Sequence, residues 1–144
     1  HESEQTVVLS DFAHHPTAIS GALESLRARW PDREILACFE PRSNTAVTNV
    51  FEDRFADALA LADIALLGAV HRAEKIPEEK RINPANMIAR IEESGKKGYF
   101  FSTNSDLESF LAERESNQPC LVVFFSNGSF DGVIGRFAES VKNT

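Results

Sequence analysis

The chain has 144 residues, of which 42% are hydrophobic and 26% charged, and its formal net charge is -7 at pH 7. This length and composition are typical of a globular domain with its own core, not of a disordered or fibrous chain. The acidic balance argues against non-specific binding to nucleic acid or to an anionic membrane. No apolar run approaches the roughly 20 residues that a membrane-spanning helix requires.

Two cysteines and the opening residues bear on the compartment. Cys38 and Cys120 each lie in an apolar, strand-like run, and both are predicted to be reduced thiols in the core. The chain opens with polar residues and reaches a strand almost at once, so no signal peptide is expected. The sequence thus predicts a cytoplasmic protein with neither a nucleic-acid nor a membrane partner.

Strand-like and helix-like patterns alternate along the chain. Short apolar runs predict strands over Thr6–Ser10, Ile35–Phe39, Ile64–Leu67, Tyr99–Phe101 and Cys120–Phe125. Apolar residues at helical spacing predict helices over about Pro16–Arg29, Val50–Leu61, Asn83–Gly95, Ser105–Arg114 and Phe130–Val141. The charged segment between Arg72 and Arg81 is predicted to be an exposed loop.

The predicted strands are nearly continuous apolar runs, which is typical of strands buried on both faces of a mostly parallel sheet. We therefore expect an α/β fold, namely a Rossmann-like domain of three layers with about five to six strands between two layers of helices. No internal repeat or linker interrupts the pattern, so residues 1–144 are predicted to form a single domain. Two predicted helix starts carry the spacing of a capping box, Asn49 with Glu52 and Ser105 with Glu108.

Three polar segments follow strands of this predicted sheet, at residues 11–17, 40–45 and 126–130. The carboxyl ends of parallel strands lie along one edge, where open α/β sheets bind ligands, so we expect the three segments to lie together. They offer carboxylates, imidazoles, a guanidinium, hydroxyls and amides. This set suits a polar ligand that carries hydroxyls and carboxylates.

In the first segment, the role of Asp11 is open. Its carboxylate could cap a turn, or it could accept hydrogen bonds from vicinal hydroxyls such as those of a ribose. His14 and His15 could bind a metal, but adjacent histidines point apart and no third ligand has suitable spacing. No metal site is therefore predicted, and one histidine is more simply explained as lining a ligand pocket.

The other two segments also allow a structural and a functional interpretation. Arg42 is either a solvated loop residue or a binder of a carboxylate, which its fork of donors suits. Glu40 is expected to face solvent. Ser126-Asn127-Gly128 could be a simple turn, although its backbone amides and the helix start after it would favour an anion.

Motifs of self-contained catalysis are absent from the sequence. It contains no G-x-x-x-x-G-K-[ST] phosphate loop, no G-x-G-x-x-G after the first strand and no G-x-S-x-G nucleophile elbow. The residues alone therefore predict a Rossmann-like domain with a polar ligand edge and no catalytic residues of its own.

The segment Asp11-Phe12-Ala13-His14-His15-Pro16-Thr17 resembles the motif that opens the carboxyl-terminal domain of Mur ligases. These enzymes join amino acids or peptides to UDP-N-acetylmuramate during peptidoglycan assembly. Residues 40–45 and 126–132 resemble one branch most, which ligates the murein tripeptide L-Ala-γ-D-Glu-meso-diaminopimelate in peptidoglycan recycling. The resemblance extends over nearly the whole chain.

This resemblance implies the third domain of a three-domain, ATP-dependent ligase, with UDP-N-acetylmuramate, the tripeptide and ATP as its partners. It implies Mg²⁺ as well, held mainly by a central domain that is absent from this chain. By the same resemblance, ATP binding falls to Asp11, His14 and His15. Peptide binding falls to Arg42, Ser43, Asn44, Ser126, Asn127, Gly128, Ser129 and Phe130.

The implied reaction passes through an acyl phosphate on the muramoyl carboxylate, which the amine of the peptide then attacks. The isolated domain is expected to be inactive. Two other functions are left open by the sequence. A UDP-N-acetylmuramate–L-alanine ligase shares the His-His-Pro motif, and a non-catalytic nucleotide- or peptide-binding module with the same fold would also lack a phosphate loop. The oligomeric state is not predicted.

Overall fold

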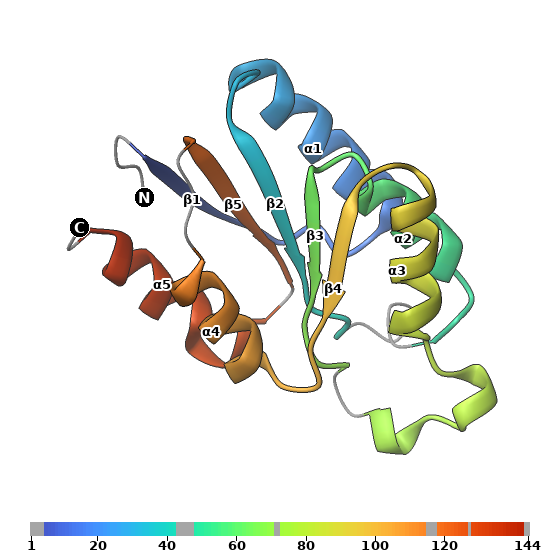
Figure 1. Cartoon of the computed structure of the whole chain (residues 1–144). Coiled ribbons are helices and arrows are strands. Elements are labelled where there is room, and N and C mark those ends of the chain that lie inside the picture. The colour runs from blue at the N-terminus through green and yellow to red at the C-terminus, as the bar shows by residue number, and fades with distance from the viewer. Residues whose placement is uncertain (1–4, 43–47, 71–72, 115–117, 127, 143–144) are drawn as a thin grey trace.

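A computed structural model describes residues 5–42, 48–70, 73–114, 118–126 and 128–142. Within these residues five strands form one sheet in the order β1-β5-β2-β3-β4, and each neighbouring pair is parallel (Figure 1). The strands are β1 (Thr6–Asp11), β2 (Glu34–Phe39), β3 (Ile64–Leu67), β4 (Lys97–Phe100) and β5 (Cys120–Phe125). The predicted α/β class is therefore confirmed, with a sheet that is parallel throughout.

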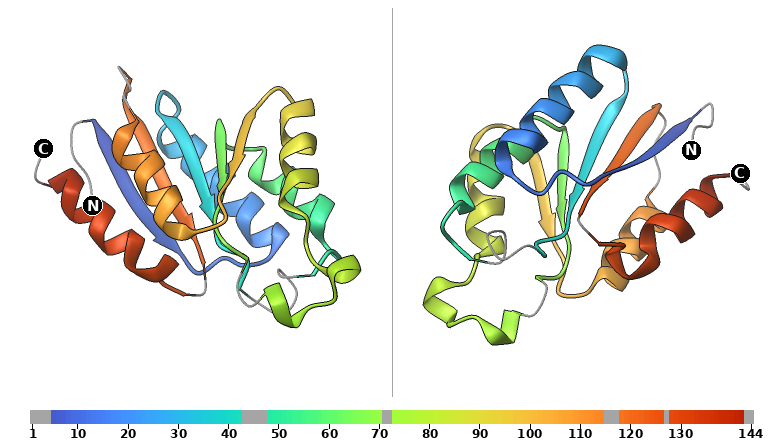
Figure 2. Two further views of the ribbon diagram at one scale, coloured as in Figure 1. Left: turned by 60° about the horizontal axis from the view of Figure 1, so that its bottom comes forward. Right: turned by 180° about the vertical axis from the view of Figure 1, so that it is seen from behind.

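Helices cover both faces of this sheet, as Figures 1 and 2 show. One face carries α1 (Pro16–Arg29), α2 (Glu52–Leu59) and α3 (Pro84–Glu93). The other face carries α4 (Asn104–Glu113) and α5 (Val133–Lys142). Each face has its own cluster of buried apolar side chains, so the predicted arrangement of three layers is confirmed.

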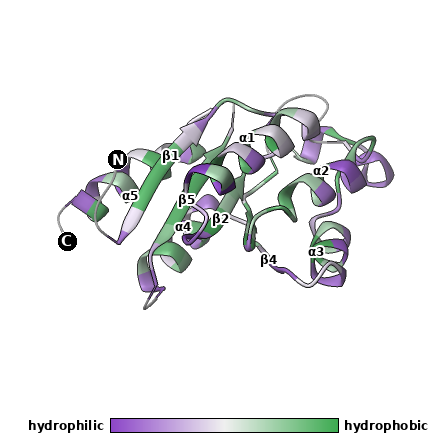
Figure 3. Cartoon of the chain, turned by 90° about the horizontal axis from the view of Figure 1, so that it is seen from above, coloured by the Kyte–Doolittle hydropathy of each residue, from purple (hydrophilic) through white to green (hydrophobic). Residues whose placement is uncertain are grey.

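The core lies where the central strands meet the two helix layers. Every residue of β5 is buried, and Figure 3 shows the apolar strands between helices whose outer faces are hydrophilic. Alternate residues of β2 point to opposite faces of the sheet. Phe39 packs on Phe55 of α2 with ring centroids 4.9 Å apart, and Cys38 lies in the apolar cluster beneath α4 and α5. Burial raises the pKa of the Cys38 thiol, which is therefore neutral and serves as a small apolar core residue.

Both predicted capping boxes are absent from the structure. The amino-terminal cap of α4 is Thr103, whose Oγ1 accepts a hydrogen bond from Asp106 N at 3.1 Å, so the predicted capping box of Ser105 and Glu108 is wrong. The Glu108 carboxylate instead pairs with Arg136 of α5, with 2.8 Å between Oε1 and Nη2. A residue caps a helix only when its own backbone is extended, and this condition is met two residues earlier, at Thr103.

The predicted box of Asn49 and Glu52 is also absent. Helix α2 begins after Phe51 without a side-chain cap, and Glu52 Oε1 accepts a hydrogen bond from Asn83 N at 2.6 Å. This bond ties the start of α2 to the start of α3. Asn83 itself caps α3, because its Oδ1 accepts from Asn86 N at 3.1 Å, and Pro84 occupies the first turn as predicted.

Short 3₁₀ helices complete the described structure. The charged segment predicted as a loop contains η1 (Ala73–Lys75) and η2 (Glu78–Lys80), and η3 (Phe130–Gly132) precedes α5. None of the described helices is both long and apolar enough to cross a bilayer.

The strand order creates a switch point at the carboxyl edge of the sheet. Strands β1 and β5 are neighbours, yet the chain leaves β1 for α1 on one face and leaves β5 for α5 on the other. Backbone hydrogen bonds extend the sheet into the loops, from Ser126 N to Asp11 O at 3.2 Å and from Glu40 N to Phe125 O at 3.1 Å. The ends of β1, β5 and β2 therefore lie together, at the position where open α/β sheets bind ligands.

Candidate functional site

A buried carboxylate, that of Glu40, lies at the centre of this edge. Only 4% of the residue is exposed, so the expectation that it faces solvent is wrong. Its Oε1 accepts hydrogen bonds from Ser126 Oγ at 2.6 Å and from Phe130 N at 3.2 Å, and its Oε2 accepts from Asn104 Nδ2 at 2.9 Å. These donors compensate the cost of burying a charge, which is otherwise large.

Asn104, at the first turn of α4, extends the network to two further segments. Its Nδ2 also donates to Asp131 Oδ2 at 3.0 Å, and its Oδ1 accepts from Ala69 N at 2.9 Å. A side chain at Gly68 would obstruct this arrangement, because a β-carbon there would lie 2.5 Å from Asn104 Oδ1. One amide thus connects the segments that follow β2, β3 and β5. This role could not be predicted from the sequence, because Asn104 occupies an ordinary helix start.

Arg42 approaches the same network from the loop after β2. Its Nη1 lies 4.0 Å from Glu40 Oε2, at the outer limit of an ion pair, and 30% of its side chain is exposed. The side chain lies across Gly128, where a β-carbon would stand 2.5 Å from Arg42 Nε. Gly128 N donates to Ser126 Oγ at 2.9 Å, so the loop beneath the guanidinium is also tied to the network. The guanidinium keeps an exposed side that can bind an anion.

The turn after β5 has an unusual backbone. Phe130, Asp131 and Gly132 have φ values of 54°, 55° and 83°, which place three consecutive residues in the left-handed region. For the two non-glycine residues this conformation costs about 1–3 kcal/mol each. The Phe130 side chain is nevertheless fully buried against Phe124, at a centroid distance of 5.4 Å. Packing and the hydrogen bonds to Glu40 and Asn104 hold the turn in place.

Asp11 lies at the end of β1 with its side chain exposed. Its Oδ1 accepts a hydrogen bond from Ala13 N at 2.8 Å, which is the turn-capping role that the sequence left open. Oδ2 has no partner among the described residues, so one carboxylate oxygen remains available to a ligand. The same conformation of Asp11 therefore allows it to cap the turn with one oxygen and to accept a hydrogen bond from a ligand with the other.

The rings of the two adjacent histidines contact different partners. His14 Nδ1 is 2.9 Å from Phe12 O, and because a carbonyl only accepts, Nδ1 carries the proton. His15 packs against Phe51 at a centroid distance of 5.8 Å, and its ring is tilted by 64° from that of His14. Phe12 between Asp11 and the histidines is 79% exposed. Among the described residues no group of three or more His, Cys, Asp or Glu side chains is placed to hold a metal ion.

A small cavity joins the first and third predicted segments. Its volume is about 50 Å³, and it is lined by Ser10, Asp11, Phe12, Ser126, Gly128 and Ile134. Pockets that enclose a drug-sized ligand measure roughly 300–1,000 Å³, so this cavity alone is too small to enclose one. Ser129 lies in the turn between Gly128 and Phe130. Ser43, Asn44 and Asn127 lie outside the described residues.

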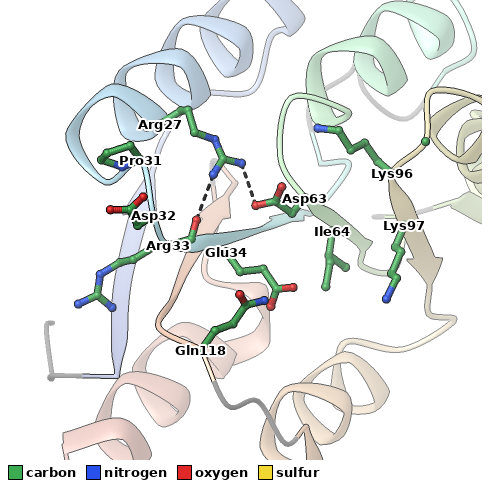
Figure 4. Close-up of a pocket in the computed structure, with 11 residues that line it drawn as sticks. Arg27, Pro31, Asp32, Arg33, Glu34, Asp63, Ile64, Lys96, Lys97 and Gln118 are labelled. Carbon is green, nitrogen blue, oxygen red and sulfur yellow. Dashed lines mark hydrogen bonds and ion pairs between the residues drawn. The ribbon is translucent and has the colours of Figure 1, made fainter.

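A larger cavity, of about 380 Å³, lies at the opposite edge, where the strands begin (Figure 4). Several of its charged groups, among them Arg27, Asp63 and Lys96, are bound to one another or to the backbone. Asp63 Oδ2 accepts from Arg27 Nη2 and from Ile35 N, each at 2.8 Å, and Lys96 Nζ donates to two carbonyls at the end of α2, each at 3.1 Å. Burial opposes ionisation of Asp63, but the hydrogen bonds from Arg27 and Ile35 N, together with the charges of Arg27 and Lys96, hold its pKa below the usual value. These hydrogen bonds link the end of α1 and the start of β2 to Asp63, and they link Lys96 to the carbonyls that follow α2.

The fold is an α/β domain whose polar groups gather at one edge of the sheet, where β1, β5 and β2 end. Residues 1–128 match the family model described as Mur ligase, glutamate ligase domain. The chain belongs to the Mur ligase family.

Curated relatives with this similarity are much longer than the chain. It is 35% identical over 92 residues to the UDP-N-acetylmuramate–L-alanine ligase of Lactococcus lactis subsp. cremoris (strain MG1363), which covers 64% of this chain and 20% of that protein. It is 31% identical over 109 residues to the enzyme of the same name from Sulfurihydrogenibium sp. (strain YO3AOP1), covering 76% and 24%. The aligned part thus spans about a fifth to a quarter of these relatives.

Solved structures show the same fold. The UDP-N-acetylmuramate–alanine ligase of Thermotoga maritima superposes with a TM-score of 0.73 at 22% identity, over 99% of this chain and 28% of that one. A murein peptide ligase of Psychrobacter arcticus 273-4 gives 0.72 at 26% identity, over 99% and 29%. A domain assigned to a UDP-N-acetylmuramate:L-alanyl-γ-D-glutamyl-meso-diaminopimelate ligase of Haemophilus ducreyi 35000HP gives 0.65 at 22% identity, over 94% and 91%.

Proposed function

We propose that this chain is the carboxyl-terminal domain of an ATP-dependent ligase that joins L-Ala-γ-D-Glu-meso-diaminopimelate to UDP-N-acetylmuramate. The observation that carries the proposal is the place of Arg42. Its guanidinium lies over Gly128, its side chain is 30% exposed, and Asp11 lies at the same edge. A tripeptide with several carboxylates offers this guanidinium a partner, and the adjoining edge offers the nucleotide an acceptor for its hydroxyls.

In the proposed reaction the muramoyl carboxylate attacks the γ-phosphate of ATP and forms an acyl phosphate. The amine of the tripeptide then attacks the acyl carbon, the amide bond forms and phosphate leaves. Asp11 accepts hydrogen bonds from the ribose through its available oxygen, and His14 and His15 lie beside the nucleotide. Mg²⁺ would offset the charge of the phosphates. Among the described residues no cluster is placed to hold it, and we propose that a central domain of the full-length protein does so.

The incoming peptide contacts the segments after β2 and β5. Arg42 binds a carboxylate of the peptide, with Ser43 and Asn44 beside it. The loop formed by Ser126, Asn127, Gly128, Ser129 and Phe130 supplies hydroxyl and amide donors. The cavity at this edge is small, so another part of the full-length protein must close over it to exclude water from the acyl phosphate.

Ligation of L-alanine is the second candidate, because the curated relatives described above are UDP-N-acetylmuramate–L-alanine ligases. Alanine has a single carboxylate and a methyl side chain, so it would use less of the polar edge. The chain matches a murein peptide ligase structure at 26% identity and an alanine ligase structure at 22%, a difference too small to decide between them.

Phosphate release by the full-length protein tests the proposal. The protein is given ATP, Mg²⁺ and UDP-N-acetylmuramate, with either L-alanine or the tripeptide as the amine. Turnover with the tripeptide alone is expected. Turnover with L-alanine alone would assign the second function and would contradict the tripeptide proposal.

A further inference from the structure

We infer that Glu40 is a positioning residue, which holds Arg42, Ser126 and the turn at residues 128–130 together as one unit that receives a carboxylate of the amine substrate. The inference rests on the proposed function, and it deepens it by naming the buried group on which selection of an anionic substrate depends. Glu40 itself cannot touch the substrate, because only 3% of its side chain is exposed.

Both oxygens of the Glu40 carboxylate face donors only. Oε1 accepts from Ser126 Oγ and Phe130 N, while Oε2 accepts from Asn104 Nδ2 and faces Arg42 Nη1. These donors come from three separate parts of the chain, at the end of β5, at the start of α4 and in the loop after β2. A single charge thus fixes the relative positions of groups that no stretch of local structure connects.

The chemistry of the site requires a carboxylate and not an amide. In a Glu40→Gln variant the new NH₂ group would replace one oxygen. On one side it would face the donors of Asn104 and Arg42, and on the other it would face the backbone N–H of Phe130. Either orientation places a donor against a donor, so the amide cannot satisfy the site although its shape is the same.

The distance between Glu40 and Arg42 leaves the guanidinium able to bind a ligand. At 4.0 Å the two groups attract without forming a short, two-pronged pair that would occupy the fork of donors. Gly128 supports the guanidinium from below, and Glu40 anchors that loop through Ser126. The buried carboxylate therefore orients Arg42, and its exposed side remains for the substrate.

Kinetics of the full-length protein test the inference with a matched pair of variants. Glu40→Gln is compared with Asp63→Asn, which weakens a hydrogen-bonded carboxylate at the opposite edge of the sheet. We expect Glu40→Gln to raise KM for the tripeptide roughly 10- to 100-fold, with KM for ATP and kcat changed by less than about threefold. Asp63→Asn should leave all three constants unchanged. Equal effects of Glu40→Gln on the tripeptide and ATP constants would overturn the inference.

A second variant and a second measurement keep the test decisive. If Glu40→Gln does not fold, Glu40→Asp takes its place. This variant retains the charge but withdraws it by one methylene, and it should also raise KM for the tripeptide selectively. The apolar clusters lie within this chain, so the isolated chain can be used for NMR of the Arg42 Nε–Hε group. This resonance should shift and exchange faster in either variant, and an unchanged resonance would refute positioning. Because no substrate is present, the NMR result is independent of whether the tripeptide proves to be the substrate.

Discussion

Arg42 lies across the backbone of Gly128 so closely that a β-carbon on Gly128 would stand 2.5 Å from Arg42 Nε and 2.9 Å from its Cζ. The contact joins the loop after β2 to the loop after β5. The glycine is needed here for space, since any side chain would occupy the position of the guanidinium. Substitutions at this contact therefore test the site without disturbing the core.

Gly128→Ala should displace the Arg42 guanidinium and weaken use of the amine substrate. We expect KM for the tripeptide to rise about tenfold in the full-length protein, because one charge-assisted contact is weakened, while KM for ATP is unchanged. The measurement is steady-state phosphate release with each substrate varied in turn.

Gly21→Ala is the matched control. No atom lies within 4 Å of a β-carbon at Gly21, which occupies the middle of α1. This variant should keep both KM values and should stabilise the protein by about 0.5–1 kcal/mol in a urea melt, as alanine is favoured over glycine in helices. A rise of KM for the tripeptide in the control, or none in Gly128→Ala, would contradict the role of this contact.

Asp11→Ala should impair use of ATP. Under the proposed function, the change removes an acceptor for the ribose hydroxyls, and kcat/KM for ATP should fall by the equivalent of about 1.5–3 kcal/mol. Asp11 also accepts a hydrogen bond from Ala13 N, so Asp11→Asn serves as the comparison. Asp11→Asn retains an oxygen that can cap the turn but loses the charge, and its kcat/KM for ATP should lie between those of wild type and Asp11→Ala. An unchanged dependence on ATP in both variants would exclude Asp11 from the nucleotide site.

Asp63 should contribute to stability above acidic pH. Its pKa in the folded protein is lowered, because the hydrogen bonds from Arg27 and Ile35 N outweigh the opposing effect of burial. The carboxylate therefore stabilises the fold above its unfolded pKa of about 3.9, and this contribution is lost as the pH falls through the lower folded pKa. Asp63→Asn should lower the free energy of unfolding by about 1 kcal/mol at pH 7, a modest value for a site a third exposed.

Urea melts at pH 7 and pH 3 measure this effect. The difference in stability between wild type and Asp63→Asn should be largest at pH 7 and should shrink at pH 3. A constant difference at the two pH values would show that the ionised carboxylate is not the source of the stability.

The isolated chain should release no phosphate from ATP when it is mixed with Mg²⁺, UDP-N-acetylmuramate and the tripeptide. The cavity at the proposed site measures only about 50 Å³, so under the proposal other parts of the full-length protein complete the site. Phosphate release above the blank by a chain freed of contaminating ATPases would contradict the assignment of catalysis to other parts of the full-length protein.

The strands and most helices could be predicted because their determinants are local. Continuous apolar runs marked β2 and β5, and Pro16 marked the start of α1. Asn83 and Pro84 marked α3 in the same way. The two capping boxes failed because each glutamate has a partner distant in sequence, so its spacing within the helix start carried no information.

The centre of the site could not be predicted because it depends on the order of the strands. β5 lies between β1 and β2, although it is last in the sequence, and this order brings Ser126 and Phe130 to Glu40. A glutamate after an apolar strand is usually exposed, so its burial here required knowledge of those donors. The last helix was predicted to begin at Phe130, but α5 begins at Val133. The positive φ of Phe130 places this residue in a separate turn before α5.

The most direct measurement is a double-mutant cycle in which substitution of Arg42 is combined with amidation of the tripeptide carboxylates. The values of kcat/KM are compared for wild type and Arg42→Gln in the full-length protein, each with the tripeptide and with an analogue whose diaminopimelate carboxylates are amides. If Arg42 binds one of these carboxylates, amidation should cost wild type about 10- to 100-fold and should cost Arg42→Gln much less. Equal losses in the two proteins would show that Arg42 and the carboxylates do not interact, and would contradict the proposed site.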